Sequence, residues 1–415
     1  MSFKKVTLSI LTIILILVIL GSFAVAVEAK TKVKVMSWWD FTKHESLIGL
    51  KAAFEQKNPD LEIEWGRIGG SEYADKMLTI IAGGGEVPDV MMLAMDQVPV
   101  YASKGAIIAL DKYMTESYKN SLYPVVLDAV KFNGNYYAAA RDVTSKVMYL
   151  NKKLFDEAKV PYPSENWSWD DFRKISKQLT KGDSQWGFYF PKYADGFDHW
   201  LRLNGGGMVT RDGKSLLAMP ESIEALQFFQ DMIVKDKSIP TESQAKQFGT
   251  SDVSSMLAGK CAMQAGGLSK SLDLINAKIE YLIRPLPVPT GKKPLSVAFI
   301  NTWTIPKGAK NPDLSWRVVE FFSGNDGQKI VLDTNMGLPA SKGVDLSAFL
   351  QKHPDNKYLV DSLAISVPFS APMYCSDFFR LMQTEFDLMW LGQRSVKDAV
   401  SAVEKAAPNV LSGKK

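Results

Sequence analysis

Hydrophobic and polar residues change between two spacings in the segment that follows residue 30. Residues 32–37 and 61–65 alternate in the manner of a strand, whereas residues 45–57 and 71–82 repeat apolar side chains at helical spacing. Residues 90–93 form a short, wholly apolar run, which is typical of a parallel strand covered on both faces. The order strand, helix, strand, helix, strand predicts a doubly wound α/β lobe with its ligand site beyond the carboxyl ends of the strands.

A second unit begins after a polar stretch at residues 141–146. An apolar strand at residues 147–150 opens this unit, and helices are expected after Ser168 and over residues 220–235. Further strands are expected at residues 187–190, 259–264 and 297–305, and further helices at residues 314–322, 328–332, 377–391 and 396–407. The last strand leads back toward the first unit, so the predicted fold class is α/β, with two doubly wound lobes joined by crossing hinge strands.

The expected division of the chain follows from these elements. A tight hairpin at Asn133-Gly134 lies near the end of the first passage through the first lobe. The expected parts are residues 30–140 with 304–344 as the first lobe, residues 145–296 with 345–415 as the second lobe, and residues 141–144 and 297–303 as the hinge crossings.

The first 29 residues have the layout of a secretory signal. Lys4 and Lys5 precede an apolar run over residues 6–20, a Gly21-Ser22 break follows, and small residues lead to Ala29. A retained membrane anchor is the alternative, because the uncharged stretch approaches the ~20 residues that a membrane span needs. The segment contains no Cys, so the protein is expected to be exported to the periplasm or outside the cell without a lipid anchor on Cys.

The composition narrows the class of protein. Among 415 residues, 49 are basic and 45 acidic, a balance that excludes a nucleic-acid binder working through bulk charge. Three His and two Cys occur, without HExxH or paired CxxC spacing, so neither a metal site nor a cofactor is expected. Export permits a disulfide between Cys261 and Cys375, but isolated cysteines also behave as small buried apolar residues, and the sequence leaves both open.

Several short motifs occur in one order along the chain after the signal. They are Gly84 with Val87-Pro88-Asp89-Val90, Tyr149-Leu150-Asn151-Lys152, Trp169-Asp170-Asp171-Phe172, residues 257–263, Trp303-Thr304-Ile305-Pro306 and residues 392–399. In these motifs the chain resembles the extracellular solute-binding proteins of carbohydrate ABC importers, the family that includes maltodextrin-binding proteins.

The resemblance has implications for fold and partners. It implies the type II periplasmic-binding-protein fold, a sugar held in a cleft between two lobes, no catalysis, transporter permease subunits as partners, and a monomer. One position departs from the family pattern, because Leu268 stands where the family often has an aromatic residue after a pair such as Gly266-Gly267.

A sugar site needs aromatic rings against the C–H faces and polar side chains for the hydroxyls. Trp38, Trp39 and Asp40 supply both at a strand end, and because adjacent strand residues face opposite ways, one indole is expected in the cleft. Met95 and Asp96 end the third strand, where the alternative role of Asp96 is to cap the next helix. The full set of expected ligand-binding residues is Trp38, Trp39, Asp40, Arg67, Met95, Asp96, Arg141, Phe197, Trp200, Gly266, Gly267, Leu268, Asn301, Trp303, Tyr374 and Phe378.

Two groups of candidates in the second lobe have an alternative interpretation. Phe197 and Trp200 belong to an aromatic cluster that either faces the cleft or packs in the core. Gly266 and Gly267 either let the backbone approach a ligand closely or form an ordinary turn between a strand and a helix.

Positive charges near the predicted strand ends bear on the charge of the ligand. Arg67, Arg141 and Lys146 either grip the carboxylate of an acidic oligosaccharide or are ion-pair partners and solvated surface cations. A secreted hydrolase with paired carboxylates and a sugar-sensing module remain alternative functions. The expected function is the capture of a sugar or oligosaccharide by stacking and hydrogen bonds, followed by delivery to a membrane permease.

Overall fold

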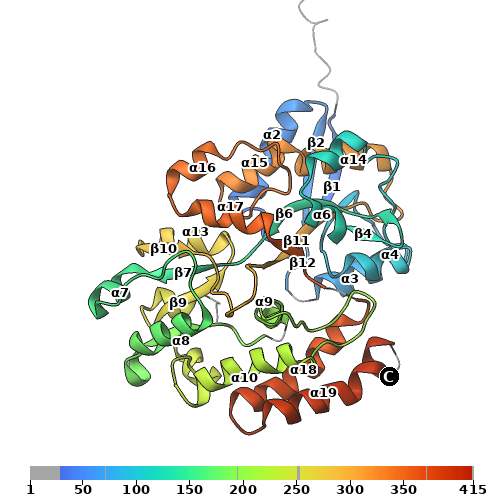
Figure 1. The fold of residues 1–415 in the computed structure, drawn as a ribbon. Helices are drawn as coiled ribbons and strands as arrows, with labels where there is room; N and C mark the ends of the chain where they lie inside the picture. The colour runs from blue at the N-terminus through green and yellow to red at the C-terminus, as the bar shows by residue number, and fades with distance from the viewer. Residues whose placement is uncertain (1–28, 71, 194, 250–252, 371, 414–415) are drawn as a thin grey trace, which may run out of the picture.

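Two separate β-sheets, each flanked by helices, divide the chain into an upper and a lower lobe (Figure 1). The computed structural model describes residues 29–70, 72–193, 195–249, 253–370 and 372–413. The expected signal segment, residues 1–29, therefore lies outside the described residues except for Ala29. Within the described ranges, no helix is long and apolar enough to cross a membrane.

The sheet of the first lobe has six strands. Its order is β12-β11-β3-β1-β2, and β6 pairs with β11 as an additional strand. β1 runs parallel to β2 and β3, whereas β11 runs antiparallel to β3 and β6. The strands are β1 (Thr31–Ser37), β2 (Leu61–Arg67), β3 (Val90–Ala94), β6 (Ala139–Thr144), β11 (Ser296–Thr304) and β12 (Ser366–Pro368).

Helices cover both faces of this sheet, as the apolar run at residues 90–93 predicts. Met92 of β3 packs in the core that contains residues of α2 (Glu45–Lys57) and α14 (Pro312–Ser323). Met91 points the other way, into the core formed with α3 (Tyr73–Ala82) and α4 (Val98–Ser103). Adjacent strand residues thus enter opposite cores, which is the consequence of the two-residue period of a strand.

The remaining elements of the first lobe are short. The predicted hairpin joins β4 (Lys131–Phe132) to β5 (Asn135–Tyr136), and its turn residues Asn133 and Gly134 both have positive φ. The other helices here are α5 (Glu116–Ser121), α6 (Pro124–Ala129) and α15 (Asn325–Asp333).

The second lobe is built on a four-stranded sheet in the order β10-β7-β9-β8. Its strands are β7 (Val147–Asn151), β8 (Trp186–Tyr189), β9 (Cys261–Gly266) and β10 (Tyr281–Arg284). Its helices are α7 (Lys152–Ala158), α8 (Trp169–Gln178), α9 (Asp198–Leu203), α10 (Pro220–Val234), α11 (Glu242–Ala245), α12 (Ser254–Leu257), α13 (Ser269–Asn276), α18 (Cys375–Trp390) and α19 (Val396–Leu411). The strand expected at residues 259–264 is thus shifted by two residues.

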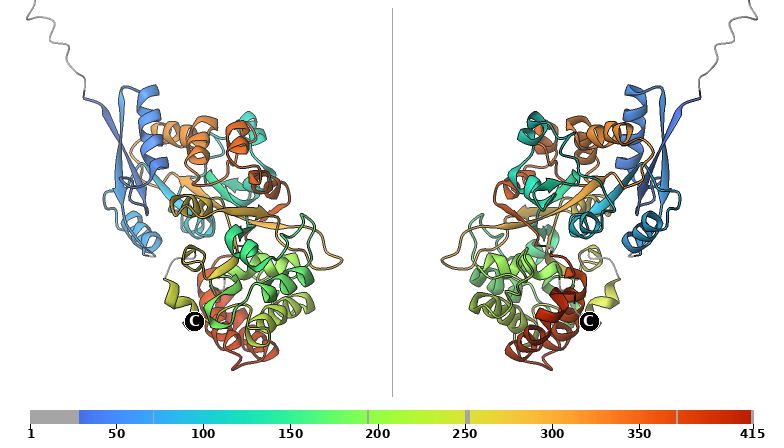
Figure 2. Two further views of the ribbon diagram at one scale, coloured as in Figure 1. Left: turned by 90° about the vertical axis from the view of Figure 1, so that its left-hand side faces the viewer. Right: turned by 90° about the vertical axis from the view of Figure 1, so that its right-hand side faces the viewer.

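The connections between the lobes differ from the expected hinge crossings. Residues 141–144 and 297–303 lie in β6 and β11, which pair with each other inside the first sheet. The chain passes from β6 to β7 through Ser145 and Lys146 alone, and returns after β10 through residues 285–295. A third connection leads from β12, which ends at Pro368, to α18, which begins at Cys375. Figure 2 shows the lobes one above the other with these connections between them.

Two helices depart from the expected division, which assigned residues 345–415 to the second lobe. α16 (Ser347–Lys352) and α17 (Asn356–Ala364) lie beside α15 in the upper lobe in Figure 1. Phe349 and Leu359 belong to a large core that includes residues of the first sheet and also Tyr149 and Tyr281 of the second. Apolar side chains from α17 join that core, and the sequence pattern alone does not specify which lobe receives such a helix.

Candidate ligand site

The carboxyl ends of β1, β2, β3 and β6 lie at one edge of the first sheet. Ser37 at the end of β1 pairs with Arg67 at the end of β2. Asn301 of β11 pairs with Ala94 at the end of β3 on one side and with Asp142 of β6 on the other. This edge carries what we call the strand-end cluster, whose members are Trp38, Trp39, Asp40, His44, Arg67, Arg141, Asp142 and Asn301.

An irregularity in β6 determines where Arg141 points. The register between β6 and β11 runs from Asp142 opposite Asn301 to Ala140 opposite Thr302, so Arg141 has no partner residue across the ladder. One extra residue on one strand is a β-bulge, which changes the direction of the side chain that it carries. Adjacent residues of a regular strand point to opposite faces, but here Arg141 and Asp142 contact each other.

Arg141 and Asp142 form a buried ion pair. The side chains are 2% and 0% exposed, and both Nε and Nη2 of Arg141 contact Asp142 Oδ2. Asn301 Nδ2 donates to the other carboxylate oxygen at 3.1 Å. Arg141 Nη1 is also buried and has no acceptor among the described residues, which is uncommon for a buried donor.

Trp39 packs against this pair and Trp38 packs against Trp39, and both residues remain partly exposed. The Arg141 guanidinium carbon lies 4.0 Å from the ring centroid of Trp39, a cation–π contact. The His44 ring stacks on Trp39 at 4.8 Å, and Trp38 meets Trp39 edge-on at 5.8 Å. Burial lowers the pKa of His44 below its ordinary value, and the positive charge of Arg141 lowers it further, so His44 is neutral at pH 7.

In the second lobe, Gly266 and Gly267 are approached closely by other residues of the protein. A Cβ on Gly267 would come within 2.5 Å of Cγ2 of Thr144, at the end of β6. Gly267 also accepts a hydrogen bond from the Tyr149 hydroxyl at 2.9 Å. The close approach that Gly267 allows is therefore to the strand leading into the hinge, and Gly266 similarly faces the side chain of Lys270.

Four aromatic residues expected at the ligand lie in the cores instead. Trp200 stacks on Phe172 at 5.9 Å and Trp303 lies 5.2 Å from Phe322. Burying a large aromatic ring completely removes much apolar surface from water and is therefore strongly favourable, so these rings pack in the core where the neighbouring side chains fit them. Besides Arg141, the expected ligand-binding residues that are at most 2% exposed are Met95, Phe197, Trp200, Leu268, Trp303 and Phe378.

The remaining expected residues keep some exposure. Asp96 is half-buried and accepts a hydrogen bond from Gln97 Nε2 at 2.8 Å, while Tyr374 is 43% exposed. Arg67 lies 3.8 Å from Asp40, and Lys146 Nζ lies 3.3 Å from both the Gly196 carbonyl and His199 Nδ1.

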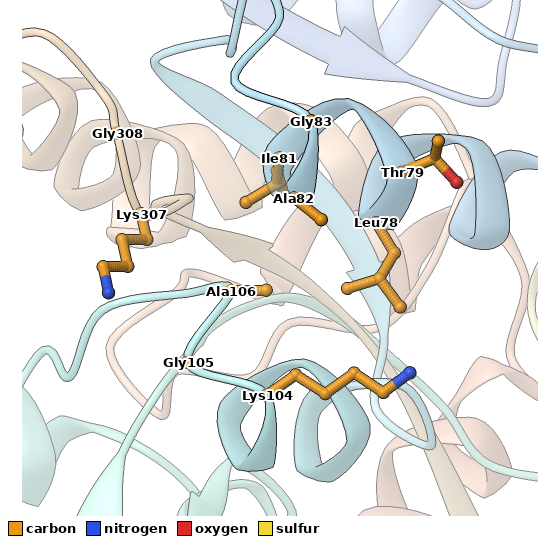
Figure 3. Close-up of a pocket in the computed structure, with 10 residues that line it drawn as sticks. All are labelled: Leu78, Thr79, Ile81, Ala82, Gly83, Lys104, Gly105, Ala106, Lys307 and Gly308. Atoms are coloured by element: carbon orange, nitrogen blue, oxygen red, sulfur yellow. The ribbon is translucent and has the colours of Figure 1, made fainter.

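A further pocket of the described surface lies away from this cluster. Figure 3 shows this pocket of about 850 Å³ between the end of α3 and the segment around Lys307, with Lys104 on its rim. α3 ends just before β3 begins, and Lys307 follows the end of β11. The pocket therefore belongs to the end of the first sheet opposite the strand-end cluster.

Comparison with known proteins assigns the family. The sequence profile of the bacterial extracellular solute-binding proteins matches residues 38–329, which is more than half of the chain. The chain belongs to this family.

Individual relatives of this solute-binding protein are distant in sequence. An arabinooligosaccharide-binding protein of Bacillus subtilis is 24% identical over 339 residues, covering 78% of this chain and 77% of that protein. A maltotriose-binding protein of Pyrococcus abyssi is 23% identical over 300 residues, covering 70% and 63%. An ABC substrate-binding protein of Listeria monocytogenes, solved in complex with cycloalternan, superposes with a TM-score of 0.82 at 25% identity, covering 93% of this chain and 100% of that one. The neighbours confirm the predicted fold of two α/β lobes.

Two members of the strand-end cluster were not among the expected ligand-binding residues. Asp142 is the counter-ion of Arg141, and its position directly after Arg141 in the sequence is a signal that was available. His44 stacks on Trp39 from the start of α2, and no sequence pattern indicates that contact. Both cysteines of this solute-binding protein are free and buried, so the open question of a disulfide is answered for this structure.

Proposed function

We propose that this protein is the substrate-binding component of an ABC importer and that it binds a neutral oligosaccharide at the strand-end cluster. It holds the sugar between its lobes, does not convert it, and delivers it to the membrane permease. This is the function expected from the sequence. The sequence left open whether the ligand is neutral or acidic, and we propose a neutral one.

The observation that carries the proposal is the arrangement of Trp39 and Arg141. A partly exposed indole lies beside a fixed guanidinium whose Nη1 lacks an acceptor among the described residues. Sugars present apolar C–H faces to a ring and hydroxyl oxygens to a donor, so this pair matches both parts of a sugar ring. Trp38 adds a second indole at an angle of 70° to the first.

The charge of the cluster supports a neutral ligand. Asp142 compensates Arg141 inside the protein, and Asp40 lies near Arg67. The negative charge of Asp142, directly beside the guanidinium, would cancel much of the attraction of Arg141 for an acidic sugar. The ion-pair interpretation of these arginines is therefore the one that we adopt.

The names of the relatives support an oligosaccharide as ligand. The Bacillus and Pyrococcus proteins are named for binding arabinooligosaccharide and maltotriose, and the Listeria protein was solved with cycloalternan. All three are linked to an oligosaccharide by name or by bound ligand, so the same class of ligand is the first to test here.

A thermal-shift panel of mono- and oligosaccharides tests the proposal, together with mass spectrometry of any sugar that copurifies. A ligand at a hundred times its Kd should raise the free energy of unfolding by ~2.7 kcal/mol, because it binds the folded state alone. Trp39→Ala should weaken binding by about tenfold, whereas Trp39→Phe, which keeps an aromatic face, should weaken it less.

Two outcomes would contradict the proposal. One is the absence of stabilisation by any carbohydrate of the panel. The other is consumption of an oligosaccharide by the pure protein, with the activity lost when one carboxylate is replaced, which would identify a hydrolase.

A further inference from the structure

A pocket of about 400 Å³ lies in the second lobe, and none of its described lining residues belongs to the strand-end cluster. The lining comes from β8, α11 and α18 and from the segments next to them. Lys192, three residues after the end of β8, is one of the lining residues although it is only 5% exposed. Lysine is seldom buried unless an acid pairs with it, so a buried lysine at a pocket is a candidate functional group.

The Lys192 ammonium is enclosed and has no ion-pair partner among the described residues. Its Nζ donates to the Pro240 carbonyl oxygen at 2.8 Å and lies 5.6 Å from the ring centroid of Tyr189. A neutral carbonyl and a ring face stabilise the charge less than the water around an exposed lysine does. Burial therefore lowers the pKa of Lys192 to about 8, although the charges of Glu242 and Asp387 act in the opposite direction.

Two carboxylates line the same pocket and differ in their contacts. Asp387 Oδ1 accepts a hydrogen bond from Gln383 Nε2 at 2.7 Å, and the same Nε2 donates to the Lys192 carbonyl oxygen at 2.8 Å. Oε2 of Glu242, by contrast, is buried and has no donor among the described residues. The pocket thus brings together a buried amine and an unpaired carboxylate oxygen, and Lys246 is the other charged group of its described lining.

The neutral form of a lysine amine is a nucleophile toward a carbonyl carbon. Its lone pair attacks the carbon of an aldehyde, the aldehyde oxygen leaves as water with the two hydrogens of Nζ, and a C=N double bond to the lysine remains. The reaction needs no activated leaving group, because water is the only product besides this imine. At pH 7.5 about a quarter of an amine with a pKa of about 8 is neutral, against ~0.1% of an ordinary lysine.

We infer that Lys192 is a covalent modification site for small aldehydes, which enter this pocket and form an imine on Nζ. The open-chain form of a reducing sugar carries such an aldehyde, so the class includes trioses and other short sugars. Glu242 Oε2 accepts a hydrogen bond from a hydroxyl group of such a molecule. The inference goes beyond the proposed function and does not depend on it, because the described lining belongs to the second lobe alone.

Incubation of the native protein with glyceraldehyde and sodium cyanoborohydride at pH 7.5, followed by peptide mass spectrometry, tests the inference. Cyanoborohydride reduces the imine and thereby fixes it on the lysine that formed it. Lys192 should be modified at least ~10-fold faster than Lys246, an exposed lysine at the same pocket. In urea the two rates should be equal, because the pocket is lost. The comparison is made within one sample and needs no variant that folds.

The pH profile and the size of the aldehyde distinguish this site from an exposed lysine. The rate at Lys192 should reach half its maximum near pH 8, and Glu242→Gln should move this midpoint to lower pH, because a negative charge that favours the ammonium is lost. Glu280→Gln, the same change at an exposed acid outside the pocket, should leave the midpoint in place. Periodate-oxidised dextran, whose aldehydes are on a polymer too large for the pocket, should modify Lys246 and spare Lys192.

Four results overturn the inference. They are a rate at Lys192 no higher than at Lys246 in the native protein, the same ratio of rates in urea as in buffer, a midpoint above pH 10, and modification of both lysines alike by oxidised dextran. Sugar binding at the strand-end cluster is measured separately, so none of these results bears on the proposed function.

Discussion

Replacing Asp142 with Asn tests the most buried charge of the candidate site. The change removes the counter-charge of Arg141 and nearly preserves the size of the side chain. Both partners are at most 2% exposed, so water cannot take over the lost interaction. Breaking a buried pair by removing one partner costs ~3–5 kcal/mol, which lowers the Tm of a domain of this size by ~6–20 °C.

Thermal unfolding followed by tryptophan fluorescence measures this loss, because Trp39 contacts the pair. Asp40→Asn is the matched control, since its partner Arg67 is half-exposed and 3.8 Å away, and it should leave the Tm almost unchanged. The double variant Arg141→Met, Asp142→Leu removes both charges and should recover most of the stability lost by the single variant. Two results would refute the idea that an unpaired buried charge causes the loss of stability. One is an equal Tm for Asp142→Asn and the wild type, and the other is a double variant that is no more stable than the single one.

Three further predictions follow from buried groups and the hinge. Burial and the nearby Lys146 ammonium hold the pKa of His199 well below its ordinary value. Below pH ~6.5 the unfolded chain binds a proton at His199 and the folded protein does not, so the free energy of unfolding should fall by up to ~1.4 kcal/mol per pH unit. His199→Gln should flatten this dependence on pH. Burial raises the pKa of Cys261 and Cys375 to about 12, so iodoacetamide should modify neither thiol at pH 8 in the native protein and both in urea, as mass spectrometry would report. In Gly267→Ala the new methyl group would collide with Thr144, so the lobes should stay apart. Small-angle scattering with saturating sugar should then give a larger radius of gyration than for the wild type. Adding Thr144→Ser, which removes the obstructing methyl group, should restore closure.

The regular elements of the first lobe were predictable because their side-chain pattern has a single interpretation. The helix expected at residues 45–57 is α2 with the same bounds, since three large apolar residues repeat at helical spacing and Asn58-Pro59 ends it. The strand expected at residues 90–93 is β3, and its burial on both faces follows from its wholly apolar composition. Local sequence was sufficient for these elements because the pattern and the tertiary packing agree.

The arrangement of the candidate site was predictable only in part. The α/β rule located Trp38, Trp39 and Asp40 at a strand end, and the structure has them there. β6 was interpreted as a polar crossing because Arg141, Asp142 and Thr144 occur together, whereas the ion pair and the bulge let this polar segment enter a sheet. A bulge depends on the register of two strands whose paired residues Asp142 and Asn301 are 159 positions apart in sequence, and no local pattern encodes it.

Aromatic residues show the same limit. Phe197 and Trp200 were equally compatible with a cleft and with a core, since both environments favour large rings. The structure packs them with Phe229, at 5.1 and 4.8 Å, inside the second lobe. Whether these rings face the cleft or the core depends on their packing against α10, which contacts α9 only in the folded protein. The periodicity of either segment alone therefore could not predict it.

The cost of the Arg141–Asp142 pair indicates why the site is built as it is. Two charges removed from water are at best weakly stabilising, and an apolar pair of similar volume usually serves a core as well or better. Yet the bulge re-aims Arg141, Asn301 orients the Asp142 carboxylate, and Gly337 leaves space that a Cβ, 2.6 Å from the Asp142 Cβ, would close. These three features share one consequence, which is to hold a guanidinium against Trp39 with a donor still unpaired among the described residues. Stability does not account for such an arrangement, whereas the recognition of a hydroxyl-rich ligand beside an indole, as we propose it, would.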